Sequence, residues 1–149
     1  MRLVVQTLIT FLVALPPFWA VAEDFSPKLR FKPGEPAVGT GLVESLDGPS
    51  AVAALEDGLN GLRALLAYPE YRIEVSGFAD SGECLGAACE ELSRRRARDT
   101  FYWLIERGVP RERLIFKFYG VSRSLTKDSH PVNRRVELNA VIEPRPAVR

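Results

Sequence analysis

The chain has 149 residues, of which 46% are hydrophobic and 26% are charged. These proportions are typical of a globular domain and exclude an intrinsically disordered chain. The 20 Lys and Arg residues nearly balance the 19 Asp and Glu residues, so the overall charge gives no electrostatic footprint for a nucleic acid. We therefore expect one domain whose partner is not a polyanion.

The N-terminus predicts export. The segment "MRLVVQTLITFLVALPPFWAVA" has an early Arg2, an apolar run over Leu3–Leu15 and a small-x-small ending at Ala20-Val21-Ala22, which is typical of a signal peptidase site. The apolar run is shorter than the roughly 20 residues of a membrane span. We predict a cleaved signal peptide over residues 1–22, with a retained signal anchor as the alternative.

Residues 23–49 form a segment rich in proline and glycine, with prolines at positions 27, 33, 36 and 49. Such a composition disfavours a long central strand. It allows a short first strand at either Lys28–Phe31 or Val38–Val43, and the pattern does not choose between them. The segment is also a candidate docking arm for an envelope protein.

Two helices and three strands are predicted over residues 50–143, before a C-terminal tail at residues 144–149. Apolar residues at helical spacing indicate a helix over Ala51–Ala67, with Ser50 as its N-cap, and a second helix over Glu90–Arg107. The strands are "YRIEVSGF", which alternates between apolar and polar residues, "RLIFKFYG" and "RRVELNAVI". This order predicts an α/β (α+β) fold, with helices packed on a small sheet.

Cys84 and Cys89 are the only cysteines. An even number of cysteines in an exported protein favours a disulfide, here one that closes a small loop. A redox-active pair is a weaker alternative because the two thiols are further apart than in the usual dithiol motif. A metal site is not predicted, since no further Cys or His lies nearby to complete a zinc site.

Four short motifs, in order and at matching spacing, resemble the OmpA-like domain, a peptidoglycan-binding module of bacterial envelope proteins. The family typically reads V-x-G-[HYF]-[TA]-D, L-S-x-x-R-A, a G-[VI] turn with [RK]-[LI], G-x-G and N-R-R-V-E. The matching residues are Val75–Asp80, Leu92–Ala97, Gly108-Val109 with Arg113-Leu114, and Asn133–Glu137, whereas no G-x-G is present. The resemblance implies a βαβαβ-type fold with a small mixed sheet and helices on one face.

The resemblance also implies a ligand, the meso-diaminopimelate of peptidoglycan stem peptides. In the family an Asp and an Arg hold this ligand, and the matching positions are Asp80 and Arg96. The free end of diaminopimelate carries an ammonium and a carboxylate on one carbon. A carboxylate suits the first group and a planar, bidentate guanidinium suits the second. We expected Arg96 on the first turns of its helix, where the helix N-terminus would also favour the ligand carboxylate.

Other positions are expected at the rim of this pocket or depart from the family pattern. The expected rim residues are Phe78, Ala79, Leu92, Asn133 and Arg134, the last with a second possible role in bracing the sheet through Glu137. Phe78 and Ala79 stand where the family usually has an imidazole or tyrosine and a threonine, and Cys89 stands where it often has an asparagine.

Three interpretations compete with ligand binding. Asp80 and Arg96 could form an internal ion pair beside a solvated face of Arg94, Arg95 and Arg98. The fold could also serve as a scaffold or interaction subunit of an envelope complex with a degenerate pocket. An enzyme is not predicted, because the single histidine, His130, lies in a polar loop and no hydrolase or zinc-protease motif is present. We expect a non-catalytic protein without cofactors, in the periplasm and associated with the outer membrane or cell wall.

Overall fold

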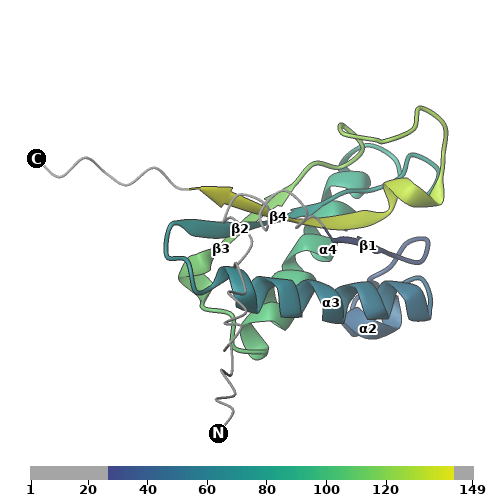
Figure 1. Ribbon diagram of the computed structural model, residues 1–149. Helices are drawn as coiled ribbons and strands as arrows, with labels where there is room; N and C mark the ends of the chain where they lie inside the picture. Colours follow the sequence, from purple (N-terminus) through teal and green to yellow (C-terminus); the bar gives the residue numbers. More distant parts are fainter. Residues whose placement is uncertain (1–26, 143–149) are drawn as a thin grey trace, which may run out of the picture.

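The computed structural model describes residues 27–142 as a four-stranded mixed sheet with its helices on one face (Figure 1). The strand order is β1-β4-β2-β3, in which β2 pairs with β3 in parallel and β4 is antiparallel to both β1 and β2. The strands are β1 (Lys28–Arg30), β2 (Tyr71–Gly77), β3 (Leu114–Phe118) and β4 (Arg135–Ile142), and the helices are α2 (Leu42–Ser45), α3 (Pro49–Leu65), α4 (Ala87–Glu106) and the 3₁₀ turns η1 (Arg111–Arg113) and η2 (Pro131–Asn133). The predicted fold class is confirmed.

The first strand lies at the earlier of the two predicted positions. β1 pairs with the beginning of β4, and the next residue, Phe31, is fully buried in the core. Residues 38–43 do not form the alternative strand, because the chain there turns into α2. The proline-rich segment from residue 27 onward thus supplies an edge strand and part of the core.

Both long helices begin earlier than the sequence pattern indicated. α3 begins at Pro49, so Ser50 is not its N-cap; Gly48 precedes the helix with a φ of 83°, and Pro49 fits the first turn because that position needs no N–H donor. α4 begins at Ala87 and ends at Glu106, before the predicted stop at Gly108. The predicted apolar stripe of the second helix is buried.

Gly77 sets how closely α4 approaches the sheet. A side chain at this position would collide with the backbone carbonyl of Ser93 and would crowd Ala97. Only a residue without Cβ lets the helix pack this near the end of β2. The same approach brings the start of the following loop against α4, the helix that carries Arg96.

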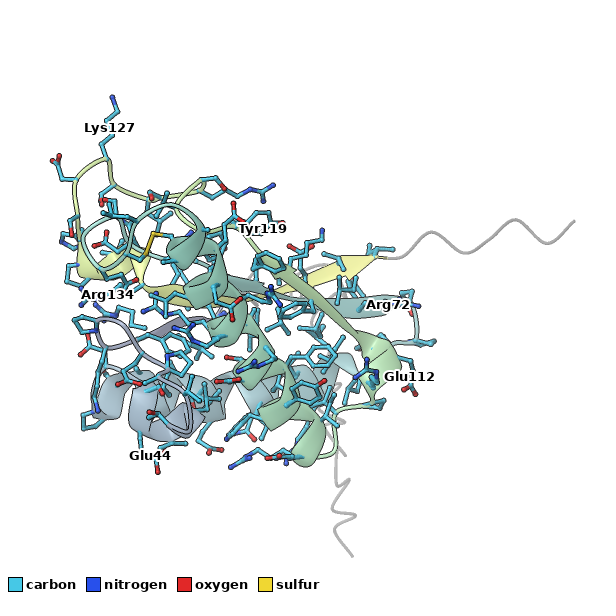
Figure 2. All side chains as sticks on the ribbon, turned by 180° about the vertical axis from the view of Figure 1, so that it is seen from behind. Glu44, Arg72, Glu112, Tyr119, Lys127 and Arg134 are labelled. Atoms are coloured by element: carbon cyan, nitrogen blue, oxygen red, sulfur yellow. A yellow bond between two sulfur atoms is a disulfide. The ribbon has the colours of Figure 1, made fainter. Side chains whose placement is uncertain are left out.

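The end of the sheet beyond Gly77 carries the long connection between β3 and β4 (Figure 1). Lys127 projects from the tip of this connection, away from the body of the molecule (Figure 2). Residues 78–86 lie beside it, held by a hydrogen bond from the Ala79 amide to the Gly120 carbonyl. Among residues 27–142, no helix has the length and apolarity needed to cross a bilayer. The predicted signal segment lies outside the described residues.

Candidate functional site

Asp80 lies three residues after β2 and is almost fully buried, with 1% of its surface exposed. One carboxylate oxygen accepts hydrogen bonds from the backbone N–H of His130 (2.9 Å) and from Asn133 Nδ2 (3.0 Å). The other accepts from Ser129 Oγ and from the Gly82 N–H. The carboxylate is therefore surrounded by donors from its own turn and from the connection that leads to β4.

These donors keep Asp80 ionised despite its burial. Burial alone would raise the pKa of the carboxyl group, but the hydrogen bonds from Ser129, Asn133, His130 and Gly82 outweigh it and lower the pKa to about 2. None of the salt bridges among residues 27–142 involves Asp80. Its negative charge is stabilised by neutral donors and is not cancelled by a cation.

Gly82 makes room for this arrangement. A Cβ at this position would collide with the Ser129 hydroxyl and lie 3.0 Å from Asp80 Oδ2. The tight turn after Asp80 and the approach of the Ser129 loop therefore depend on the same missing side chain.

Arg96 is the tenth residue of α4 and lies in its third turn, because the helix begins at Ala87. The expectation of a guanidinium beside the helix N-terminus is wrong. At a rise of about 1.5 Å per residue, the guanidinium belongs to a turn well beyond the helix start, where the dipole of that end has faded. The Arg96 side chain is fully buried, with 0% exposed.

The guanidinium of Arg96 is paired with Glu83 and not with Asp80. Nη1 donates to Glu83 Oε1 at 2.6 Å and Nη2 donates to Oε2 at 2.8 Å, which is the bidentate geometry of a strong carboxylate pair. The alternative interpretation, an Asp80–Arg96 ion pair, is wrong, because the salt bridges of the described residues pair Arg96 with Glu83.

Backbone carbonyls satisfy the rest of the Arg96 side chain. Nε donates to the Glu35 carbonyl at 2.8 Å, Nη1 to the Phe78 carbonyl at 3.0 Å and Nη2 to the Lys32 carbonyl at 3.3 Å. The guanidinium also lies over the Phe31 ring, with its carbon 5.2 Å from the ring centre. The segment after β1 and the loop after β2 therefore meet at this one arginine.

Glu83 is the site residue that the sequence analysis missed. Its side chain is 3% exposed, and each oxygen receives a backbone N–H besides the guanidinium: Asp80 N–H at 2.8 Å on Oε1 and Gly34 N–H at 2.9 Å on Oε2. A buried arginine requires a carboxylate partner, and Glu83, Glu90 and Glu91 are the acidic residues between the motifs of Asp80 and Arg96. That requirement was the available signal.

The residues expected at the rim have other roles. Phe78, Ala79 and Leu92 are buried, with Phe78 stacked between Tyr119 and the guanidinium of Arg135. Asn133 is buried and holds Asp80. All four side chains are buried, so none of them lies exposed at a rim as expected.

Arg134 does not brace the sheet through Glu137. Its Nε donates to the Phe31 carbonyl at 3.1 Å, and the partner of Glu137 is Arg135, at 2.6 Å. Arg134 is half-buried beside the segment that holds Arg96 (Figure 2). Of the arginines expected on a solvated face, Arg94 and Arg98 are exposed, whereas Arg95 donates to the Pro36 carbonyl at 3.0 Å.

Cys84 and Cys89 form the predicted disulfide (Figure 2). Cys84 follows Glu83 directly, and Cys89 lies in the first turn of α4. The bridge therefore ties the loop that carries Glu83 to the helix that carries Arg96. His130 is exposed in a loop, as expected, and its Nδ1 accepts from the Val132 N–H. Among the described residues, no group of three or more His, Cys, Asp or Glu could hold a metal ion.

A groove opens beside the Asp80 turn. It has a volume of about 560 Å³ and lies between Ser81 and the first half of the connection from β3 to β4. Its lining residues are mostly hydroxyl-bearing or apolar: Ser81, Val121, Ser122, Ser124, Leu125, Thr126 and Lys127.

Solved structures from several bacteria share this fold. The OmpA-like domain of FopA1 from Francisella tularensis is 22% identical, with a TM-score of 0.60 over 80% of this chain and 72% of that one. The C-terminal domain of Helicobacter pylori MotB is 22% identical, with a TM-score of 0.60 over 78% of this chain and 84% of that one. The peptidoglycan-associated lipoprotein of Burkholderia pseudomallei is 18% identical, with a TM-score of 0.58 over 77% and 90%.

A search of curated proteins finds no match to this chain. The model of the OmpA family matches residues 49–137, which is more than half of the 149 residues and includes Asp80, Glu83 and Arg96. The resemblance seen in the sequence motifs and the architecture of the described residues agree with that match, and the chain belongs to the OmpA family.

Proposed function

We propose that this protein is a non-catalytic, peptidoglycan-binding protein of the bacterial envelope. The family match and a fold shared with a protein named as peptidoglycan-associated support this function. Export through the signal predicted at residues 1–22 would deliver the chain to the periplasm, beside the outer membrane and the cell wall. A docking role of the proline-rich segment toward an envelope protein remains part of this proposal.

The ligand group is the free end of meso-diaminopimelate, with Asp80 taking its ammonium and Arg96 its carboxylate. One observation carries this assignment: Arg96 already holds a carboxylate in a bidentate pair, with two backbone N–H groups completing the seat. A ligand carboxylate would make the same four hydrogen bonds after replacing that of Glu83. Asp80, three residues before Glu83, is an anion that forms no salt bridge among the described residues.

A second candidate is a scaffold or interaction subunit of an envelope complex. It is favoured by the burial of both charges, since Asp80 is 1% exposed and Arg96 is 0% exposed. In that case the hydrogen bonds of Asp80 and the Glu83–Arg96 pair serve only to hold the loops together, and peptidoglycan would not be retained.

Sedimentation with purified peptidoglycan sacculi tests the first proposal. The protein lacking residues 1–22 should sediment with sacculi that contain meso-diaminopimelate, and free meso-diaminopimelate should release it while lysine does not. Asp80→Asn should remain in solution, because a neutral amide cannot hold an ammonium group in a buried site. Arg63→Gln is the matched control: Arg63 is exposed on α3 and bonds only Asn60 among the described residues.

Circular dichroism and thermal unfolding would establish that each variant is folded. Retention of folded Asp80→Asn at the wild-type level would contradict the role given to Asp80. Failure of the wild-type protein itself to sediment would favour the scaffold.

A further inference from the structure

We propose that Glu83 is an internal competitor for the ligand, so that its carboxylate sets both the affinity and the selectivity of the site. The inference rests on the proposed function, because it takes Arg96 as the group that receives the ligand carboxylate. It concerns a residue for which the sequence motifs gave no role.

The seat of the Glu83 carboxylate is built by other parts of the chain. Its four donors come from Arg96 on α4, from the Gly34 turn after β1 and from the Asp80 backbone after β2. All four would stay in place if Glu83 left, because carbonyls of the same segments hold the guanidinium in position. The seat therefore fits a carboxylate, whichever molecule supplies it.

Glu83, which occupies this seat, belongs in contrast to a short surface loop. Ser81, Gly82, Leu85 and Gly86 around Glu83 are all exposed, so the side chain of Glu83 is the main buried element of this stretch. Outward rotation of that side chain would cost the four hydrogen bonds and expose little apolar surface. A ligand carboxylate that takes its place restores those bonds, and the net exchange is close to neutral.

Such an exchange makes the site selective for a ligand with two charges. A carboxylate alone replaces Glu83 without a gain, since it makes the same contacts with the same guanidinium. An ammonium on the adjacent carbon adds an interaction with Asp80, which no cation among the described residues neutralises. Only a zwitterionic amino-acid centre, such as the free end of diaminopimelate, gains from both seats.

Glu83→Gln tests the competition. Each Glu83 oxygen faces one guanidinium N–H and one backbone N–H, so an amide NH₂ in either position meets two donors and is repelled. The seat should then stand open, and isothermal titration with a meso-diaminopimelate muropeptide should give at least a tenfold lower Kd than for wild type. Glu91→Gln is the matched control: Glu91 lies on the exposed side of α4, paired with Arg94 and Arg95, and its substitution should leave the Kd unchanged.

The same titration separates the inference from the proposed function. If wild type and Glu83→Gln bind equally, Glu83 is not a competitor and the proposed function stands. If neither folded protein binds the muropeptide, the proposed function is overturned and the competitor role with it. A muropeptide whose diaminopimelate ammonium is acetylated should lack the affinity that the ammonium gains from Asp80, and should bind Glu83→Gln more weakly than the unmodified muropeptide does. Equal binding of the two muropeptides would contradict the requirement for both charges.

A measurement on the wild-type protein covers the case in which Glu83→Gln does not fold. Binding of the muropeptide should shift the carboxyl ¹³C signal of Glu83, because the side chain leaves a buried ion pair for water. The Arg96 Nε–H signal should remain observable, because the Glu35 carbonyl still accepts from it. Binding with an unchanged Glu83 signal would overturn the inference.

Discussion

The two charges of the site are held in opposite ways. Asp80 is surrounded by neutral donors from the connection that leads to β4, and its charge is left uncancelled. Arg96 is surrounded by acceptors from the segment after β1, and Glu83 cancels its charge. One half of the site is therefore a buried anion without a cationic partner among the described residues, and the other half is a neutralised pair.

This difference shows that a motif residue can occupy its expected position while another side chain neutralises its charge. Asp80 and Arg96 both occupy their expected positions in the motifs, but the ion pair that decides their availability involves a third residue. The energetic consequence also differs, because loss of one member of a buried pair leaves an unpaired charge, whereas loss of a charge held by neutral donors leaves only unmet hydrogen bonds.

Arg96→Ala should give the largest loss of stability. It leaves the Glu83 carboxylate buried without its cation. Loss of one member of a buried ion pair typically costs about 3 to 5 kcal/mol of unfolding free energy. Urea unfolding measures the change in unfolding free energy. Arg94→Ala, at an exposed position two residues earlier, should change it by no more than about 0.5 kcal/mol. Equal losses in the two variants would show that the buried Glu83–Arg96 pair stabilises the fold no more than an exposed ion pair does.

Protonation of Asp80 should have the next largest effect. Its folded-state pKa of about 2 lies below the ordinary value of 3.8, so the stabilisation is fully present above the ordinary pKa and is lost as the pH falls toward 2. A shift of this size corresponds to about 2 kcal/mol. Unfolding in urea over this pH range should show that loss for wild type and not for Asp80→Asn. An unchanged slope in Asp80→Asn would mean that other carboxylates cause it.

Removal of the disulfide should have the smallest effect of the three. The paired substitution Cys84→Ser and Cys89→Ser opens a small ring, for which chain entropy predicts a loss of up to about 2 kcal/mol. Thermal unfolding measures this loss against the oxidised wild type, and the reduced wild type should unfold like the variant. Because Glu83 directly precedes Cys84, one end of the ring, the Arg96 half of the site should loosen, while the pKa of Asp80 stays low. A raised Asp80 pKa would show that the two halves are not independent.

The elements of the fold followed from local patterns, whereas their boundaries followed from tertiary contacts. Alternation along "YRIEVSGF" correctly predicted β2, since one face of that strand packs against helices. The starts of α3 and α4 were misplaced because no side chain caps either helix: Gly48 and Gly86 precede them with positive φ. β1 is only three residues long, too short for a period of two to be recognised.

The site residues divide in the same way, into those that local motifs identify and those that contacts between distant segments bring together. Asp80 and Arg96 could be found from their motifs, whereas the need of a buried arginine for a carboxylate does not by itself select Glu83, because its seat includes an N–H from Gly34, 49 positions away. Asn133 and Ser129 were likewise brought to Asp80 by the pairing of β4 with β2. Contacts between such distant segments leave no local pattern.

The position of β4 has a consequence for how the chain acquires its structure during synthesis. Strand β4 pairs with both β1 and β2, so β1 has no neighbour in the sheet of the described residues until residues 135–137 have been made. Contacts this distant along the chain make folding slow and leave early strand edges open. A nascent chain that stops before residue 135 would keep β1 unpaired, and we expect it to depend on chaperones until β4 is complete.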